Sequence, residues 1–209
     1  MSEIDEKLTP QIYLITPSAF DLASFNSQLS AILDTHDIAC VRLAVSSTDE
    51  RDIAQAADLL RETCHARDVA IVLESHFRLV DPHGLDGIHL TDSTRQVRDV
   101  REALGVEAIV GTYCGASRHA GMTAGEIGAD YISFGPAVET ALGSGKIAPF
   151  DLFEWWSETV EVPVVAEGNV TLEAATILAP VVDFFALGDE IWGTDDPSSI
   201  LGEYIKQIS

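Results

Sequence analysis

The chain has 209 residues, which is enough for one well-buried domain and short for two. Twelve basic residues against 34 acidic ones give a formal net charge of -22. So much negative charge disfavours nucleic acid or an anionic membrane as a partner. We expect a single domain over residues 1–209 that binds a small molecule. The acidity fits an ordinary soluble surface, and it also fits adaptation to high salt.

The cysteines and the apolar segments indicate the compartment. Cys40, Cys64 and Cys114 are odd in number and widely spaced, with no CxxC and no clustered His/Cys spacing, which is typical of reduced thiols without a metal. The first ten residues are polar and carry three acids, unlike a secretory signal. Because no apolar run approaches the ~20 residues that cross a bilayer, we expect a cytoplasmic protein.

Short runs of β-branched and apolar residues alternate with helical patterns along the chain. This order is typical of βα units and a parallel sheet, whose strands are covered on both faces. Eight strands in about 200 residues favour a single-domain α/β fold, the (β/α)8 TIM barrel, with an open doubly wound sheet as the alternative. The expected strands are residues 11–16, 38–44, 70–74, 87–89, 108–112, 131–135, 164–167 and 184–187.

The helical patterns lie between these strands. The clearest spans residues 49–67, where apolar residues recur every three or four positions. Ser117, Asp151 and Thr171 stand where helices are expected to begin and are candidate N-caps. Residues 138–149 hold many small side chains and should form a loop after the sixth strand. In a barrel such a loop either covers the mouth or is merely flexible.

In a TIM barrel, catalytic groups collect at the carboxyl ends of the strands. Arg42 lies inside the apolar second strand, where it either faces a ligand or pairs with Glu74 on the next strand. His89 ends the fourth strand, where it either contacts a polar ligand or is a buried interior histidine. Metal binding by Glu74, Asp92 and Asp189 is a further alternative, because hard cations prefer oxygen ligands.

Two strand endings near the C-terminus indicate a phosphate-binding cup. Residues 164–169 and 184–189 each run from an apolar strand into a glycine, which places backbone N–H groups where a phosphate can sit. Glu167 and Asp189 stand beside those glycines. Their carboxylates would repel a phosphate, so the two features conflict.

Several stretches, in this order, carry a family pattern: Tyr13-Leu14-Ile15-Thr16-Pro17, Asp86-Gly87-Ile88-His89-Leu90, Gly128-Ala129-Asp130-Tyr131 with Phe134-Gly135, Pro163-Val164-Val165-Ala166 and Asp183-Phe184-Phe185-Ala186. Together they resemble the family of thiamine phosphate synthase and its relative the thiazole tautomerase. The resemblance spans nearly the whole chain, and the shared order and spacing make it specific.

The resemblance implies a (β/α)8 barrel of thiamine biosynthesis. The synthase of this family joins hydroxymethylpyrimidine diphosphate to a thiazole phosphate, with Mg²⁺ as the cofactor if the reaction is retained. The resemblance makes Arg42 the catalytic residue that orients a substrate. The residues that it assigns to substrate binding are Tyr13, His89, Thr140, Gly168, Asn169 and Gly188.

Many positions of the family pattern carry different chemistry here. In the family's Q-x-R-x-K strand only Arg42 remains, because Cys40 and Ala44 replace the glutamine and the lysine. Thr94 replaces the aspartate of the H-L-G-Q-x-D motif, which leaves Asp92 as a candidate metal ligand. A departing diphosphate needs cations around it, and these changes remove the lysine and an aspartate of the family's magnesium site. The altered site positions are Ala44, Glu74, Ser75, Thr94, Tyr113, Glu167 and Asp189.

Three functions remain open from the sequence. The first is the family's coupling reaction in thiamine synthesis. The second is a non-catalytic binding or regulatory barrel for thiamine or another unphosphorylated or cationic molecule, on which Tyr113 could stack. The third is a changed reaction with Glu74 as a base. Trp155 and Trp156 either lie at a contact between identical subunits or are buried in the outer layer of the barrel.

Overall fold

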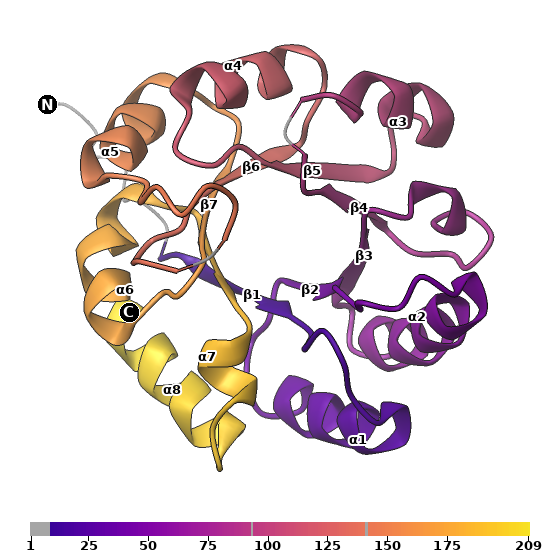
Figure 1. Cartoon of the computed structure of the whole chain (residues 1–209). Coiled ribbons are helices and arrows are strands. Elements are labelled where there is room, and N and C mark those ends of the chain that lie inside the picture. The colour runs from indigo at the N-terminus through magenta and orange to yellow at the C-terminus, as the bar shows by residue number, and fades with distance from the viewer. Residues whose placement is uncertain (1–8, 93, 141) are drawn as a thin grey trace, which may run out of the picture.

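Eight parallel strands form a closed barrel with helices around it (Figure 1). The computed structural model describes residues 9–92, 94–140 and 142–209. Each strand pairs with the next along the chain, and β1 pairs with β8. The predicted TIM barrel is confirmed, and the open sheet is wrong. The strands are β1 Gln11–Ile15, β2 Cys40–Leu43, β3 Ala70–Glu74, β4 Gly87–Leu90, β5 Ile109–Tyr113, β6 Tyr131–Phe134, β7 Val164–Glu167 and β8 Phe184–Leu187.

Helices connect most of the strands and form the outer layer (Figure 1). The connection between β3 and β4 contains a 3-10 turn, η1 Phe77–Leu79, and a second such turn, η2 Ala179–Val181, precedes β8. The α-helices are α1 Leu22–Leu33, α2 Glu50–His65, α3 Val97–Leu104, α4 Arg118–Glu126, α5 Phe150–Thr159, α6 Leu172–Leu178, α7 Asp189–Trp192 and α8 Pro197–Ile208.

The helix starts test the predicted caps. The side chains of Ser117 and Thr171 accept hydrogen bonds from backbone N–H groups in the first turns of α4 and α6, as predicted. The prediction for Asp151 is wrong, because α5 begins at Phe150 after Pro149 and Asp151 lies within its first turn. A carboxylate there still interacts favourably with the positive end of the helix.

Side chains alternate between the two faces of each strand and form separate layers. Outward-facing residues such as Leu14 and Ile71 pack against the helices in the larger apolar core. Inward-facing residues fill the barrel itself, where Tyr13, Val72 and Tyr131 belong to a smaller cluster. The polar side chains of the site follow this inner cluster towards the carboxyl ends of the strands.

A glycine makes room for one of the inner rings. An added Cβ at Gly111 on β5 would lie 1.9 Å from Cζ of Tyr131 on the neighbouring strand β6. The Tyr131 ring therefore takes the space that a side chain at Gly111 would need.

The first and last strands meet at a seam. Besides the pairing of β1 with β8, the indole N–H of Trp192 on α7 donates to the carbonyl of Ile15 on β1, at 2.6 Å. Together these contacts close the barrel between its first and last strands.

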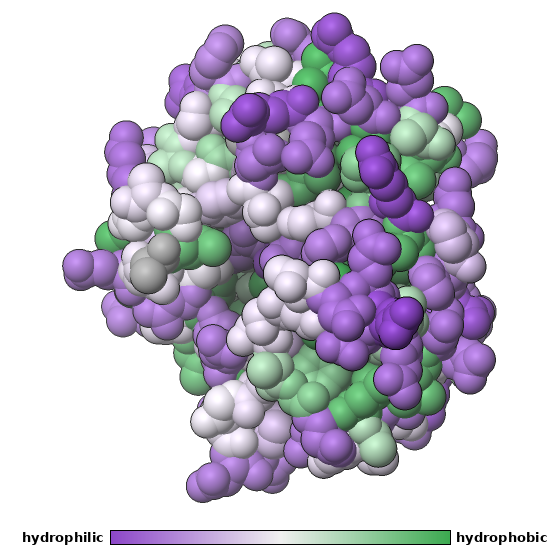
Figure 2. Space-filling view, turned by 45° about the vertical axis from the view of Figure 1, so that its right-hand side comes forward, coloured by the Kyte–Doolittle hydropathy of each residue, from purple (hydrophilic) through white to green (hydrophobic). Residues whose placement is uncertain are grey.

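The surface of the protein and the surroundings of Trp155 and Trp156 can be compared with the expectations about membranes and about contacts between subunits. Figure 2 shows hydrophilic side chains spread over much of one face, with apolar patches between them. Trp156 is buried in the outer layer, where its indole N–H donates to the Val162 carbonyl at 2.8 Å. Trp155, next to Trp156 in the chain, is covered by Arg118, whose Cζ lies 3.9 Å from the centroid of the Trp155 ring. Among the described residues, no helix is long and apolar enough to span a membrane.

Candidate functional site

A cavity of about 560 Å³ opens at the carboxyl ends of the strands, the face where TIM barrels carry their sites. We call it the mouth. Its walls come mainly from β1, β2, β3, β7, β8 and the segments that follow them. The sequence-predicted residues that line it are Arg42, Ala44, Glu74, Thr140, Glu167, Gly168, Asn169, Gly188 and Asp189.

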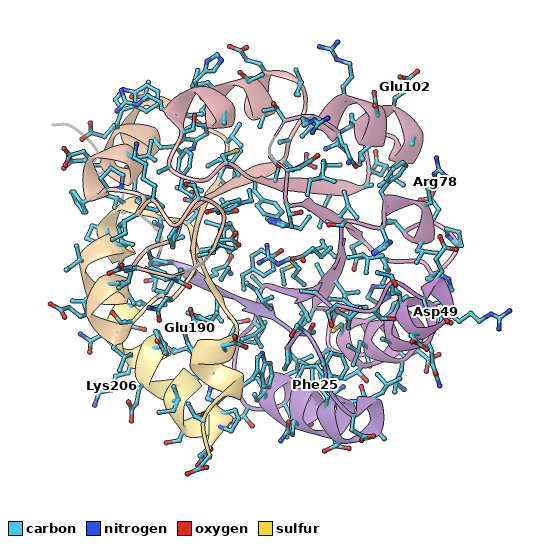
Figure 3. All side chains as sticks on the ribbon, in the orientation of Figure 1. Phe25, Asp49, Arg78, Glu102, Glu190 and Lys206 are labelled. Atoms are coloured by element: carbon cyan, nitrogen blue, oxygen red, sulfur yellow. The ribbon has the colours of Figure 1, made fainter. Side chains whose placement is uncertain are left out.

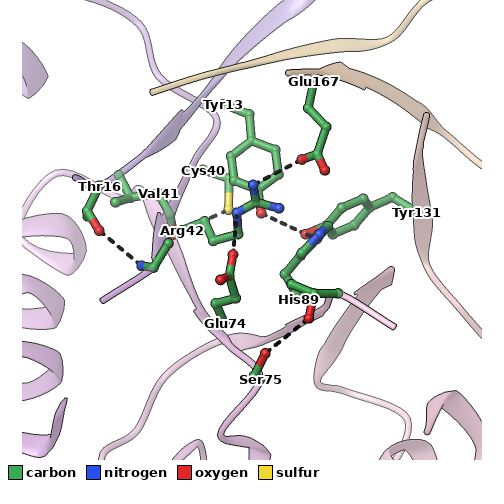
Figure 4. Close-up of polar contacts among 12 residues, drawn as sticks. Tyr13, Thr16, Cys40, Val41, Arg42, Glu74, Ser75, His89, Tyr131 and Glu167 are labelled. Atoms are coloured by element: carbon green, nitrogen blue, oxygen red, sulfur yellow. Dashed lines mark hydrogen bonds and ion pairs between the residues drawn. The ribbon is translucent and has the colours of Figure 1, made fainter. Parts of the chain in front are cut away.

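Arg42 lies at the floor of the mouth between two carboxylates (Figure 4). Its Nε is 3.4 Å from Glu74 Oε2, and its Nη2 is 3.0 Å from Glu167 Oε2. The side chain of Arg42 is only 6% exposed and that of Glu167 only 3%. The alternative that Arg42 pairs with Glu74 is thus present in the structure, with Glu167 as a second partner.

The surroundings of Arg42 and Glu74 shift the pKa of both side chains. Burial alone would lower the pKa of Arg42, but Glu167, Tyr13 and Glu74 raise it, and the net shift is upward. Burial raises the pKa of Glu74; Arg42 opposes this shift and Glu167 adds to it. Arg42 therefore stays charged, and Glu74 takes up a proton at a higher pH than an ordinary glutamate.

A chain of hydrogen bonds lies deeper in the barrel (Figure 4). His89 Nδ1 is 2.9 Å from the hydroxyl of Tyr131, which is 2.8 Å from the hydroxyl of Tyr13. Burial, with a smaller contribution from Arg42, lowers the pKa of His89 well below its ordinary value. The structure places Tyr13 and His89 in this interior chain, outside the residues that line the mouth. His89 has the surroundings of a buried interior histidine.

Some polar atoms at this depth lack protein partners. Arg42 Nη1, His89 Nε2 and Ser133 Oγ are buried and have no hydrogen-bond partner in the described part of the chain. Buried groups of this kind usually bind ordered water.

The loop after β6 covers part of the mouth. Thr140 and Leu142 line the cavity, and Asn169 Nδ2 donates to the Glu139 carbonyl at 3.3 Å. At Gly168, where φ is +85°, an added Cβ would lie 2.6 Å from a methyl carbon of Leu142. The structure thus agrees with the alternative in which this loop covers the mouth.

Glu167 and Asp189 both line the mouth, but among the described residues neither side chain is the one that bonds the amides of the two turns. Glu167 ends β7 with its side chain turned into the barrel, towards Arg42. Asp189 is exposed at the start of α7. The conflict predicted between these two carboxylates and a phosphate is therefore not located at the amides of the turns.

A different residue, Glu190, contacts those amides. Its Oε2 accepts a hydrogen bond from the Gly188 N–H at 2.8 Å, and its Oε1 accepts one from the Val170 N–H at 2.9 Å. Figure 3 shows Glu190 beside the end of β8, at the start of α7. Sequence reasoning missed Glu190. The acidic pair Asp189-Glu190 after Gly188 was the available signal, but it does not tell which carboxylate turns back.

The remaining sequence-predicted residues lie away from the mouth. Ser75 has φ of +70°, and its hydroxyl is 3.4 Å from that of Thr91. The hydroxyl of Tyr113 donates to the Gly135 carbonyl at 2.7 Å, and burial, helped by Glu167, raises its pKa to about 12. Asp92 and Thr94 lie in the segment after β4 and do not line the cavity.

The described residues do not fit a Mg²⁺ ion. Among residues 9–92, 94–140 and 142–209, no group of three or more His, Cys, Asp or Glu side chains could hold a metal. The Glu74 carboxylate is turned to Arg42, and Asp92 lies outside the mouth. The chemistry that the described residues can perform in the mouth is therefore that of their own side chains.

A closed (β/α)8 barrel with a cavity and polar side chains at the carboxyl ends of its strands defines a TIM-barrel protein. Residues 12–191 match the family described as thiamine monophosphate synthase, and the chain belongs to that family.

Individual proteins that are similar to this chain support the same family assignment. The chain is 40% identical to the thiamine-phosphate synthase of Rhodospirillum centenum over 184 residues, which cover 87% of this chain and 89% of that protein. It is 32% identical to the thiamine-phosphate synthase of Erythrobacter litoralis over 212 residues, which cover 98% of each. The structure is similar to thiamine phosphate pyrophosphorylase from Pyrococcus furiosus, with a TM-score of 0.82, 19% identity and 96% coverage of each chain.

Proposed function

We propose that this protein is a barrel of thiamine biosynthesis that binds an unphosphorylated, cationic small molecule such as thiamine in its mouth, and that it no longer couples a diphosphate to a thiazole phosphate. The observation that carries the proposal is the pairing of Arg42 with Glu74 and Glu167. Among the described residues that line the mouth, Arg42 is the only basic one, and its charge is already compensated by Glu74 and Glu167.

The charge of the lining supports a cation rather than an anion. Against one guanidinium the lining carries four carboxylates, those of Glu74, Glu167, Asp189 and Glu190. A phosphate about 4 Å from one carboxylate is repelled by roughly 4 kcal/mol at an intermediate effective dielectric. A departing diphosphate would place still more negative charge there and needs cations to stabilise it. The same field attracts a positively charged ring.

The coupling reaction itself is the second candidate. It is favoured by the relatives called thiamine-phosphate synthase, one of them 40% identical to this chain. In that reaction Arg42 would orient a substrate and Gly168 would donate to a phosphate. Neither a Mg²⁺ site nor a second cation in the mouth supports it among the described residues.

Two assays on the purified protein separate the candidates. Calorimetry should show tighter binding of thiamine than of thiamine phosphate or free hydroxymethylpyrimidine. Incubation with hydroxymethylpyrimidine diphosphate, thiazole phosphate and Mg²⁺ should give no thiamine phosphate, while an active synthase in the same assay forms it. Formation of thiamine phosphate by this protein, or tighter binding of the phosphorylated ligand, would overturn the proposal.

A further inference from the structure

We infer that Glu190 determines ligand specificity by occupying, with its own carboxylate, the backbone donors that a ligand phosphate would use at the ends of β7 and β8. The inference rests on the proposed function, because it explains which residue makes the mouth select an unphosphorylated ligand.

The two amides that Glu190 binds come from different turns. Gly188 follows β8, and Val170 follows β7, yet both N–H groups donate to one carboxylate, at 2.8 Å and 2.9 Å. Two donors that reach the two oxygens of a single carboxylate point into the same small volume. The oxygens of a phosphate have a comparable spacing, so the same donors would suit a phosphate if Glu190 were absent.

The surrounding contacts hold both turns in place. The hydroxyl of Tyr204 donates to the Val170 carbonyl at 2.6 Å, and Trp192 anchors α7 to Ile15 at 2.6 Å. Gly188 is buried, and Glu190 is half-buried and lines the mouth. The carboxylate therefore lies between fixed donors and the space open to a ligand.

Displacing this carboxylate is unfavourable for a free anion. Glu190 is attached two residues after Gly188, so its carboxylate competes for the amides as part of the same chain, at a high effective concentration. A phosphate would have to displace it and then remain near the displaced negative charge. A ligand that ends in a hydroxyl or an amine requires neither step.

The test uses inorganic phosphate as the probe and the backbone amide resonances of the full chain as the readout. Glu190→Ala removes the carboxylate, and Glu190→Gln keeps its shape without the charge. Asp189→Asn is the matched control, because it removes one charge from the mouth lining one residue away, and the Asp189 side chain makes no hydrogen bond that the described residues show.

We expect millimolar phosphate to leave the Gly188 and Val170 resonances of the unmodified protein and of Asp189→Asn unchanged. In Glu190→Ala, both amide protons should first shift upfield because their acceptor is lost, and phosphate should then move them back with an affinity at least about tenfold higher than in the unmodified protein. The phosphate affinity of Glu190→Gln should lie between that of the unmodified protein and that of Glu190→Ala.

Two results would overturn the inference. One is phosphate binding at these amides in the unmodified protein. The other is a folded Glu190→Ala variant whose amides lose their acceptor and still do not respond to phosphate. Both readouts use no thiamine and no turnover, so their failure is distinct from failure of the proposed function, which the calorimetry and the coupling assay test.

Discussion

Nη2 of Arg42 lies 3.0 Å from Oε2 of Glu167, so an ion pair joins β2 to β7 through the interior of the barrel. Both side chains are almost fully buried. Removing two charges from water costs free energy that their attraction only partly offsets. We therefore expect little net stabilisation from the pair; its effect at the site is to compensate the charge of Arg42 at the floor of the mouth.

The first prediction concerns removal of one partner of this pair. Glu167→Leu leaves the buried Arg42 with Glu74 as its carboxylate partner, at 3.4 Å. We expect the free energy of unfolding to fall by about 3–5 kcal/mol, as when a buried ion pair is broken. Urea unfolding followed by circular dichroism measures it.

The control for that change is the double variant Arg42→Met with Glu167→Leu. Because it removes both members of the pair, it should recover part of the lost stability. If the double variant is less stable by the sum of the two single changes, the two residues do not interact energetically.

The second prediction concerns the space between β5 and β6. Gly111→Ala places a Cβ 1.9 Å from the Tyr131 ring, and that ring is fixed by its hydrogen bonds to Tyr13 and His89. We expect a loss towards the upper end of the about 1–3 kcal/mol typical of overpacked cores, measured by urea unfolding.

Gly202→Ala is the matched control for Gly111→Ala. Gly202 lies in α8, where the nearest atom to an added Cβ is His36 Cε1, 3.7 Å away. Alanine there should stabilise the protein by about 0.5–1 kcal/mol. Equal effects of the two substitutions would contradict the packing described around Tyr131.

The third prediction follows from the lowered pKa of His89. In the unfolded chain His89 binds a proton below pH about 6.5, whereas the folded protein keeps it neutral to a much lower pH. Stability should therefore fall as the pH drops below about 6.5, by up to about 1.4 kcal/mol per pH unit from this group.

The measurement compares the unmodified protein with His89→Gln across this pH range. The raised pKa of Glu74 has the opposite effect, because stability from that group declines as the pH rises through its folded value. Glu74 is present in both proteins, so its contribution cancels in the difference. Parallel stability curves would show that His89 does not titrate as stated.

The fourth prediction concerns the charge of the mouth. Glu74→Gln removes a partly exposed carboxylate from the lining and should weaken thiamine binding by about two- to fivefold at low salt. Calorimetry in rising salt should show the difference shrinking. The pKa of Glu74 is raised, so this carboxylate is protonated at a higher pH than an ordinary glutamate. As the pH is lowered, the affinity of the unmodified protein for thiamine should therefore begin to fall at that higher pH.

Asp92→Asn serves as the control for Glu74→Gln. It removes the same charge from the segment after β4, outside the mouth lining. An equal loss of thiamine affinity in both variants would indicate a general charge effect rather than a contact in the mouth.

Most of the fold could be predicted from the sequence, because buried parallel strands appear as short apolar runs between helical patterns. The strand expected at residues 164–167 coincides with β7 Val164–Glu167, and the helix expected at 49–67 contains α2 Glu50–His65. Between β3 and β4 the structure has a 3-10 turn instead of an α-helix, so the regular alternation of strands and helices is interrupted there. Strand boundaries elsewhere differ by a few residues at most.

The site was harder to predict. Uniformly apolar strands show no alternation, so the sequence did not reveal that Glu167 turns inward to Arg42. The role of Glu190 depends on the backbone conformation at Gly188 and on a turn that lies 20 residues earlier in the chain, at Val170. Such contacts between turns leave no periodic pattern in a single sequence.

The seam between β1 and β8 has a consequence for how the protein is made. Gln11 pairs with Phe184, so the ring of strands closes through contacts between opposite ends of the chain. During synthesis, β1 has no partner on that side until β8 has left the ribosome, and its unpaired edge can meet other nascent chains meanwhile. The stability of the finished barrel therefore gives newly made chains no protection against association through this edge before β8 has been synthesised.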